Sequence, residues 1–420
     1  SGSETTEIAY ALGRLLRGGV GAHSAVLPEA TSDALEAFRL PLSAIAEAEL
    51  IVVVGDDPVV ERAPIVDLWL KEARRRGAEV VACSPTGTVQ VAPGGSAALC
   101  QGISAAGNEL GQRLRNADRA VLVWSGPGGG GGARIAELAH ELGFEEKPGC
   151  GAFHLPVTPN GRAVAAAWSA SADADETRPE TISVLVVSGE DAAADPGVRA
   201  LAEQAERVIV VTMFHELVGG WADLILPATG ALERDGTTMN LEGRLQRLRR
   251  AVAPPCPDEL AWISKLAARF DVEISPHASA VFAELSEHLF QDLSMDEIGL
   301  RAALPSRTAY EAPAPAAQPA SVPEHGATEL RLQRYRALIS GPAVERVREL
   351  EFQRPEREVE ISAVDARQRG ISSGDPVLVR SNGTSIELRA RVNRRLVEGI
   401  ARVAEEHAAD LHAVVEVVKA

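Results

Sequence analysis

The four cysteines of this chain are the side chains best suited to hold an iron–sulfur cluster or a zinc ion. They are dispersed, at Cys83, Cys100, Cys150 and Cys256, with no CxxC pair. Metal or cluster sites whose ligands are close in sequence need short spacings such as CxxC, and no histidines are clustered near these cysteines. We therefore expect four ordinary buried or half-buried thiols, and neither a metal site nor a catalytic residue in this chain.

A glycine-rich stretch offers a second kind of chemistry, the binding of phosphate. Residues 126–132 are all glycine except Pro127, and they follow a strand-like run and precede a helical one. The N-terminus of such a helix attracts anions. However, the glycines have no distinctive spacing, and no Lys-Ser or Lys-Thr pair follows them. A flexible loop between a strand and a helix is the favoured interpretation.

A polar segment further along the chain combines acidic, amide and basic side chains. Its four arginines are either a solvated face paired with surface carboxylates or, in part, members of a buried network. The network would join Glu233, Asn240, Glu242 and Arg244 and fix the segment to a sheet. We favour the network for Glu242 and Arg244, and the solvated face for Arg247, Arg249 and Arg250.

The apolar runs indicate the elements that hold these side chains. Residues 50–54 are an unbroken aliphatic run ending at Gly55, followed by a helical segment at 64–76 and a second strand at 79–82. This strand, helix, strand order is typical of a parallel sheet with a right-handed crossover. An amphipathic helix is expected at 7–16. Further strands are expected at 120–124, 182–187, 208–211 and 224–226, and further helices at 134–142, 198–206 and 258–270.

In the last part of the sequence, apolar residues recur with a different spacing. After a stretch rich in Ala and Pro at 304–327, typical of an extended connection, apolar and polar residues alternate. This alternation predicts short strands joined by tight turns at Gly374-Asp375 and Asn382-Gly383, and hence a small β-barrel. The expected strands lie at 358–361, 376–379, 385–388 and 390–392.

Composition excludes several classes of function. With 59 acidic and 42 basic residues the formal net charge is −17, which disfavours binding to nucleic acid or to anionic lipid. The apolar runs are far shorter than the roughly 20 residues that a membrane-spanning helix needs, so membrane association is expected only through partner subunits. A cytoplasmic protein is expected from the lack of a secretory signal and of a disulfide framework. The first residue is Ser1 rather than Met, which indicates a piece of a longer chain.

One stretch resembles a known family. The residues WADLILP at 221–227 resemble, with the polar positions after them, the signature of the molybdopterin oxidoreductases. Residues 361–377 are similar to the opening of that family's C-terminal double-psi β-barrel, the molybdopterin-dinucleotide-binding domain. The signature positions are Glu233, Gly236, Thr237, Asn240, Glu242, Gly243, Arg244 and Gln246. Weaker matches occur at Glu7, Tyr10, Leu12, Arg17, Gly55, Asp56, Asp57, Pro93, Gly94, Gly95, Asn160, Gly161 and Arg162.

The resemblance and the pattern of elements together imply an α/β fold, with two Rossmann-like parallel-sheet units followed by a small double-psi β-barrel. We expect the first unit at residues 1–115 and the second, which carries the signature, at 116–295. An Ala/Pro-rich linker is expected at 296–340 and the barrel at 341–420.

The resemblance also bears on the cofactor. In catalytic members a metal ligand sits between the first helix and the first strand, and the equivalent position here is Pro28, between Leu27 and Glu29. The nearby His23, Ser24 and Thr31 are expected to be ordinary loop residues. The cofactor's dinucleotides normally meet an acidic residue after each of two strands, and those positions here are Ser84 and Thr212. Because each missing charged hydrogen bond costs about 1.5 to 3 kcal/mol, a bound molybdopterin is disfavoured.

This pattern resembles the large iron–sulfur subunit of bacterial NADH:quinone oxidoreductases. The resemblance implies a scaffold without a redox centre in this chain, with iron–sulfur clusters in a missing N-terminal part. Its partners would be other subunits of the peripheral arm, on the cytoplasmic side of the inner membrane. The degenerate pocket would be lined by Gly55, Asp56, Asp57, Glu233, Asn240, Glu242 and Arg244.

Two alternatives stay open. One is a catalytic molybdenum or tungsten oxidoreductase of the formate dehydrogenase type, which Pro28 disfavours. The other is a regulatory or assembly module that binds a different nucleotide at the carboxyl ends of the strands, where Gly55, Asp56 and Asp57 lie.

Overall fold

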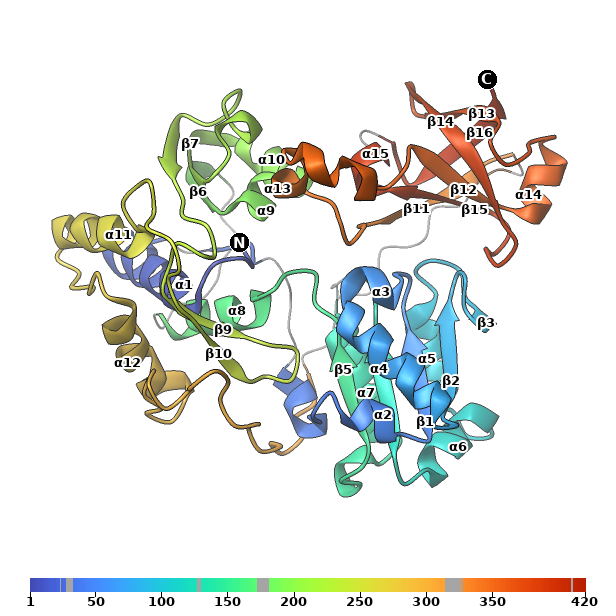
Figure 1. The fold of residues 1–420 in the computed structure, drawn as a ribbon, viewed down its shortest axis with the longest axis horizontal. Coiled ribbons are helices and arrows are strands. Elements are labelled where there is room, and N and C mark those ends of the chain that lie inside the picture. Colours follow the sequence, from blue (N-terminus) through green and yellow to red (C-terminus); the bar gives the residue numbers. More distant parts are fainter. Residues whose placement is uncertain are drawn as a thin grey trace. The chain divides into compact units, whose positions relative to one another are not determined.

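A computed structural model describes residues 1–22, 24–27, 33–126, 130–171, 181–313, 326, 328–408 and 411–420 (Figure 1). The chain forms two compact units, each assembled from separate stretches of sequence. Unit 1 comprises Ser1–Thr31 and Pro156–Ser306, and unit 2 comprises Ser32–Leu155 and Arg307–Ala420. None of the helices among the described residues is long and apolar enough to cross a membrane.

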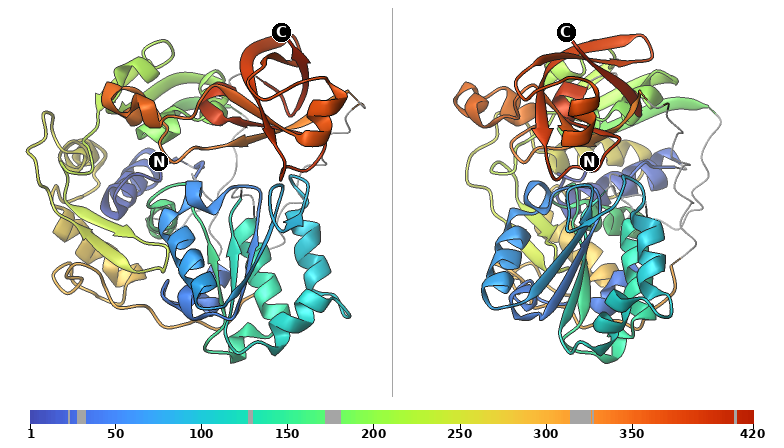
Figure 2. Two further views of the ribbon diagram at one scale, coloured as in Figure 1. Left: turned by 45° about the vertical axis from the view of Figure 1, so that its right-hand side comes forward. Right: turned by 90° about the vertical axis from the view of Figure 1, so that its right-hand side faces the viewer.

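A parallel five-stranded sheet forms the first part of unit 2. All five residues of β1 are buried, which explains why its sequence, LIVVV, is aliphatic throughout. The helices lie on both faces, α4 (Pro64–Arg75) on one and α5 (Ser96–Ser104) and α7 (Gly131–Glu141) on the other (Figure 2). In spatial order the strands are β3 (Val89–Gln90), β2 (Glu79–Ser84), β1 (Leu50–Val54), β4 (Ala120–Trp124) and β5 (Gly151–His154).

A closed six-stranded barrel forms the rest of unit 2. Asn382 and Gly383 have φ values of 42° and 88°, and they join Ser381 to its pairing partner Thr384, so the predicted tight turn is confirmed. The strands predicted at 385–388 and 390–392 are a single strand. In barrel order the strands are β11 (Leu330–Tyr335), β15 (Ile400–Ala404), β12 (Glu358–Ser362), β14 (Thr384–Asn393), β13 (Pro376–Ser381) and β16 (Val414–Lys419).

Unit 1 contains a three-stranded parallel sheet and a group of helices packed around a hairpin. The sheet consists of β6 (Ile182–Ser188), β7 (Ala205–Thr212) and β8 (Leu224–Pro227), with α9 (Glu190–Ala193) and α10 (Pro196–Ala202) packed against it. The hairpin is β9 (Gly236–Met239) and β10 (Leu245–Leu248). The helices of the second group are α1 (Thr6–Gly13), α8 (Gly161–Ala170), α11 (Glu259–Ala267) and α12 (Ala278–Leu289).

The other α-helices of the described residues are short and lie in unit 2. They are α2 (Ala44–Glu47), α3 (Val59–Arg62), α6 (Glu109–Asn116), α13 (Pro342–Glu345), α14 (Ala363–Gln368) and α15 (Glu405–Ala408).

Two predicted helices differ from the structure. All eight residues of α1 are buried, so this helix is not amphipathic, and the chain continues beyond it as a π-helical segment, Arg14–Val20. The helix predicted at 198–206 occupies Pro196–Ala202 because Asp195 caps its N-terminus and β7 begins at Ala205.

The α/β fold class, with parallel sheets and a small barrel, is confirmed. The units nevertheless divide the chain differently from the sequential domains expected above. Strand β4, expected in the second Rossmann-like unit, pairs with β1 in the first sheet, where Leu50 faces Ala120. Likewise β11, which begins at Leu330 inside the expected linker, is a barrel strand because it pairs with both β15 and β16.

Candidate functional site

The loop after β1 carries the first group of predicted site residues. Gly55 has φ +137°, and a Cβ atom at this position would lie 2.0 Å from the carbonyl oxygen of Ser125 at the end of β4. The Asp57 amide donates to that same carbonyl at 3.0 Å, and the Ser125 hydroxyl donates to the Asp57 carbonyl at 2.9 Å. Glycine is therefore required here to let the ends of two neighbouring strands approach each other.

The two carboxylates of this loop are engaged within the protein. Asp57 forms an ion pair with Arg62, whose Nε lies 2.9 Å from the carboxylate. Asp56 accepts a hydrogen bond from the Gly94 amide at 2.9 Å and lies 3.4 Å from the Ser96 hydroxyl, at the start of α5. Burial raises the pKa of Asp56, and the Gly94 hydrogen bond opposes that shift. Both side chains thus serve to fix the loop.

The second group of predicted residues lies in unit 1: Asn240, Glu242 and Arg244 are at the turn between β9 and β10, and Glu233 precedes β9. The Asn240 side-chain oxygen accepts hydrogen bonds from the amides of Glu242 and Arg244, each at 3.0 Å. The Glu242 carboxylate is buried and forms an ion pair with Arg244 Nε at 2.7 Å. Glu233 accepts a hydrogen bond from the Gly230 amide at 2.7 Å. Asn240, Glu242 and Arg244 therefore form a network that holds the turn, whereas Glu233, expected in the same network, binds the Gly230 amide instead.

The neighbouring arginines behave as the solvated-face interpretation predicts. Arg247 forms an ion pair with the exposed Asp296 at 2.8 Å, and Arg250 forms one with Asp258 at 2.6 Å. Such partly exposed pairs contribute little to stability.

Sequence reasoning missed a buried charge cluster in unit 1. Arg234 lies 2.5 Å from the Glu4 carboxylate and 3.7 Å from that of Glu259, and all three side chains are buried. Glu259 also accepts a hydrogen bond from the Thr229 amide at 2.7 Å. The position of Arg234 inside the signature, directly after Glu233, is the one sequence feature that points to this cluster.

Glu7 is a second buried acid of unit 1. Its carboxylate accepts hydrogen bonds from the amide and the hydroxyl of Thr237, at 2.9 and 2.8 Å. Complete burial raises the pKa of Glu7 to about 7, although these hydrogen bonds oppose the shift. Asn160 ties the same elements together by donating to the Glu4 carbonyl and accepting from the Met239 amide, both at 2.8 Å. The acids of unit 1 are thus committed to holding α1, α8 and the hairpin together.

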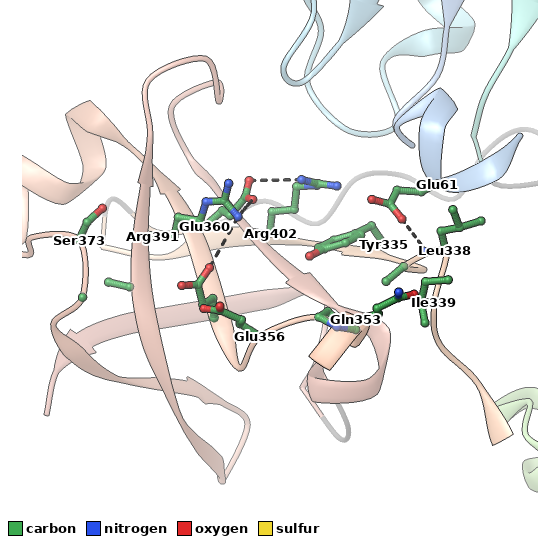
Figure 3. Close-up of a pocket in the computed structure, with 15 residues that line it drawn as sticks. Glu61, Tyr335, Leu338, Ile339, Gln353, Glu356, Glu360, Ser373, Arg391 and Arg402 are labelled. Carbon is green, nitrogen blue, oxygen red and sulfur yellow. Dashed lines mark hydrogen bonds and ion pairs between the residues drawn. The ribbon is translucent and has the colours of Figure 1, made fainter. Parts of the chain in front are cut away.

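A pocket of about 620 Å³ lies beside the barrel in unit 2 (Figure 3). Glu360, at its centre, pairs with Arg402 at 3.2 Å and with Arg391 at 3.5 Å. The Arg402 guanidinium also stacks over the Tyr335 ring, 3.8 Å from its centroid. No residue of this pocket was predicted as a site residue, because its lining combines residues of β11, β12, β14 and β15 with loop residues and Glu61 of α3, which come together only in the folded chain.

Comparison with known proteins identifies the family. The family model described as "Molybdopterin oxidoreductase" matches residues 2–258, more than half of the chain, and "Molydopterin dinucleotide binding domain" matches residues 337–416. The chain belongs to the molybdopterin oxidoreductase family. The resemblance inferred from the signature is confirmed.

Two curated relatives illustrate the range of this family. The chain is 30% identical over 242 residues to a subunit of NADH-quinone oxidoreductase from Rhizobium meliloti (strain 1021), covering 54% of this chain and 28% of that protein. It is 25% identical over 256 residues to a formate dehydrogenase alpha subunit of Methanococcus maripaludis, covering 53% of this chain and 38% of that protein. The chain therefore spans less than two fifths of the length of these relatives.

A solved structure of the same fold is acetylene hydratase from Pelobacter acetylenicus. It aligns with a TM-score of 0.54 at 14% identity, covering 95% of this chain and 74% of that chain. This similarity concerns the fold alone.

The ends of β2 and β7 lack the acidic residues that we expected in a cofactor-binding member. Ser84 and Thr212 stand at these positions. The Thr212 hydroxyl already accepts a hydrogen bond from the Phe214 amide at 3.2 Å. Since Asp56 and Asp57 are also engaged, none of these four positions offers an uncommitted carboxylate to a ribose or a guanine.

The residues around the expected metal-ligand position are described in part. Pro28, His23, Glu29 and Thr31 lie outside the described residues, whereas Ser24 is described and exposed. Within the described ranges, no group of three or more His, Cys, Asp or Glu side chains is arranged to hold a metal ion.

The four thiols are free and lie in environments that suppress ionisation. Cys83, Cys100 and Cys150 are buried and Cys256 is half-buried. Burial raises the pKa of Cys83 to about 11 and that of Cys100 to about 12. Cys83, Cys100 and Cys150 belong to the hydrophobic core around the five-stranded sheet, and all four thiols are buried or half-buried, as predicted.

Proposed function

We propose that this chain is the molybdopterin-oxidoreductase-like scaffold of the large peripheral-arm subunit of an NADH:quinone oxidoreductase. The observation that carries the proposal is that both carboxylates of the loop after β1 already have partners within the protein. Asp56 accepts a hydrogen bond from Gly94, and Asp57 forms an ion pair with Arg62. The similarity to a subunit of NADH-quinone oxidoreductase supports it. In this proposal the ancestral cofactor pocket is degenerate, and the chain stabilises the subunit without carrying a redox centre.

The proposal also says where the iron–sulfur clusters and the partners of the full-length subunit would be found. The iron–sulfur clusters of such a subunit would be bound outside these 420 residues, since the four cysteines here are dispersed and mostly buried. Its partners would be other subunits of the peripheral arm, on the cytoplasmic side of the inner membrane. Residues Gly55, Asp56, Asp57, Glu233, Asn240, Glu242 and Arg244 would then shape the remains of the pocket.

A second candidate function is a catalytic molybdopterin-dependent oxidoreductase of the formate dehydrogenase type. The similarity to the formate dehydrogenase alpha subunit favours it. In that case the dinucleotide would have to bind without the carboxylates at Ser84 and Thr212.

The two proposed functions are distinguished by purifying the tagged full-length subunit from the membranes of the host organism and assaying the activities that co-purify with it. The scaffold proposal expects NADH oxidation coupled to quinone reduction to co-purify with the subunit, without formate oxidation. Formate oxidation that co-purifies, without NADH:quinone activity, would contradict the scaffold proposal and support the second candidate. A full-length subunit that carries neither activity would also count against the scaffold proposal.

A further inference from the structure

The pocket beside the barrel has a lining that none of the functions above uses. Leu338, which is 47% exposed, and Ile339 lie at one end of it, beside Glu61. Glu356 and Glu360 lie toward the other end (Figure 3). The apolar lining residues are Ala337, Leu338, Ile339, Pro355 and Ala390, and the acidic ones are Glu61, Glu356, Glu358 and Glu360.

The charges of this pocket do not balance. Its two guanidinium groups both pair with Glu360, Arg402 at 3.2 Å and Arg391 at 3.5 Å, and Arg402 is further held over Tyr335. Arg391 reaches Glu358 only at 3.7 Å, and Glu61 accepts a hydrogen bond from the Leu338 amide. Glu356 and Glu358 therefore leave an excess of negative charge in the pocket.

The neighbouring acids make Glu358 sensitive to a cation. Burial raises the pKa of Glu358, and Glu356 raises it further through its charge and a side-chain hydrogen bond, while Arg391 opposes the shift. Glu356 and Glu358 repel each other when both are ionised. A positive charge placed between them would relieve that repulsion. An anionic ligand such as a phosphate would instead meet the four carboxylates of the lining.

The shape of the lining favours an organic cation over a metal ion. Among the described residues, no three acidic or histidine side chains converge as metal ligands do, and the pocket is far larger than a metal ion. Apolar residues together with paired carboxylates suit a side chain with a methylene stem and a planar charged head. Arginine has both, and its fork-shaped head can bind two carboxylate oxygens at once.

We propose that this pocket binds an arginine side chain of a partner protein, with the stem against Leu338 and Ile339 and the guanidinium between Glu356 and Glu358. The pocket is a docking point for a basic segment and is separate from the loop after β1. This inference does not rest on the proposed function, since it follows from the charge and shape of the pocket alone.

Methyl-labelled NMR of the whole chain tests this proposal. The probe is N-acetyl-arginine amide, and its control is N-acetyl-citrulline amide, which has nearly the same shape without the charge. The proposal expects a saturable shift of the Ile339 methyl signal with the arginine probe, weakened by added salt, and binding of citrulline at least about tenfold weaker. Equal binding of the two probes, or no saturable shift with the arginine probe, would overturn it.

A matched pair of variants locates the site. Glu356→Gln with Glu358→Gln should weaken binding of the arginine probe about tenfold, whereas Glu349→Gln with Glu351→Gln removes the same charge from exposed positions outside the pocket and should leave binding unchanged. Unaltered methyl signals of Ile371 and Ile400, buried in the barrel, would show that the variants fold. Unchanged binding in the Glu356/Glu358 variant, or an equal loss in both variants, would contradict the assignment. The salt dependence measured on the unsubstituted chain remains decisive if a variant does not fold.

Discussion

Glu7 and Thr237 are 230 residues apart in sequence, yet the Glu7 carboxylate accepts hydrogen bonds from both the amide and the hydroxyl of Thr237. This contact joins α1 to β9 in the interior of unit 1. Because the carboxylate is fully buried, its ionisation opposes folding. The relationship makes the stability of unit 1 depend on pH.

The sign of that dependence follows from the raised pKa of Glu7, about 7 against 4.5 in the unfolded chain. Below pH 4.5 the group is protonated in both states and its stabilising contribution is complete. Between pH 4.5 and about 7 the unfolded chain loses the proton first, so this contribution falls by about 3 kcal/mol in all.

The substitution Glu7→Gln should remove this dependence, because a neutral amide can still accept from the Thr237 amide and donate to its hydroxyl. Urea denaturation should find the variant about as stable as the unsubstituted chain at pH 4.5 and more stable at pH 8. A variant that is less stable at both pH values would show that the ionised carboxylate is favoured in the folded state.

Removing the charge of Arg234 should destabilise unit 1 strongly. In Arg234→Met, the buried carboxylates of Glu4 and Glu259 lose their counter-ion, which costs about 3 to 5 kcal/mol. The exposed pair of Arg207 and Asp223 is the matched control, and Arg207→Met should cost less than about 1 kcal/mol. The midpoints of chemical denaturation give both values, and similar costs for the two variants would refute the special role of Arg234.

Gly55→Ala should disturb the loop that fixes Asp56 and Asp57. The new Cβ would collide with the Ser125 carbonyl, and the backbone angle of +137° is unfavourable for alanine. We expect a loss of about 2 kcal/mol or more. Gly102→Ala, on the exposed face of α5 with nothing within 4 Å of its Cβ, should instead be neutral or stabilising by up to about 1 kcal/mol. Thermal unfolding distinguishes the two, and equal midpoints would mean that the loop relaxes freely.

The thiols should differ in their reaction with Ellman's reagent. Cys83, Cys100 and Cys150 are buried and burial raises their pKa values, so at pH 8 only the half-buried Cys256 should react within minutes in the folded chain. All four should react after denaturation. The variant Cys256→Ser should abolish the fast reaction, and a fast reaction that survives this substitution would show that a core thiol is accessible.

The sequence predicted those features that depend on neighbouring residues. The run LIVVV predicted β1, Asn382-Gly383 predicted a turn, and Glu242 and Arg244 were expected in one polar network. Features that depend on distant contacts were not predictable in this way. No feature of the neighbouring sequence shows that β4 pairs with β1. The same holds for the contact between Glu4 and Arg234, which are 230 residues apart.

The same distinction applies to the candidate sites. Gly55, Asp56 and Asp57 could be located from the strand before them, but their commitment to Ser125, Gly94 and Arg62 depends on how the loop folds. In the pocket beside the barrel, Glu356, Glu358 and Glu360 are alternate positions of one segment and could have been noticed in the sequence. Tyr335, Arg402 and Glu61 come from distant segments, so their meeting with these acids is visible only in the folded chain.

The content of metal and pterin in the protein purified from its own host tests the central claim most directly. Elemental analysis by mass spectrometry, together with pterin fluorescence after acid release, should find neither molybdenum, tungsten nor pterin in stoichiometric amount, because the strand-end positions present Ser84 and Thr212 and both acids of the loop are engaged. One molybdenum or tungsten and a pterin dinucleotide per chain would contradict the account and identify a catalytic oxidoreductase.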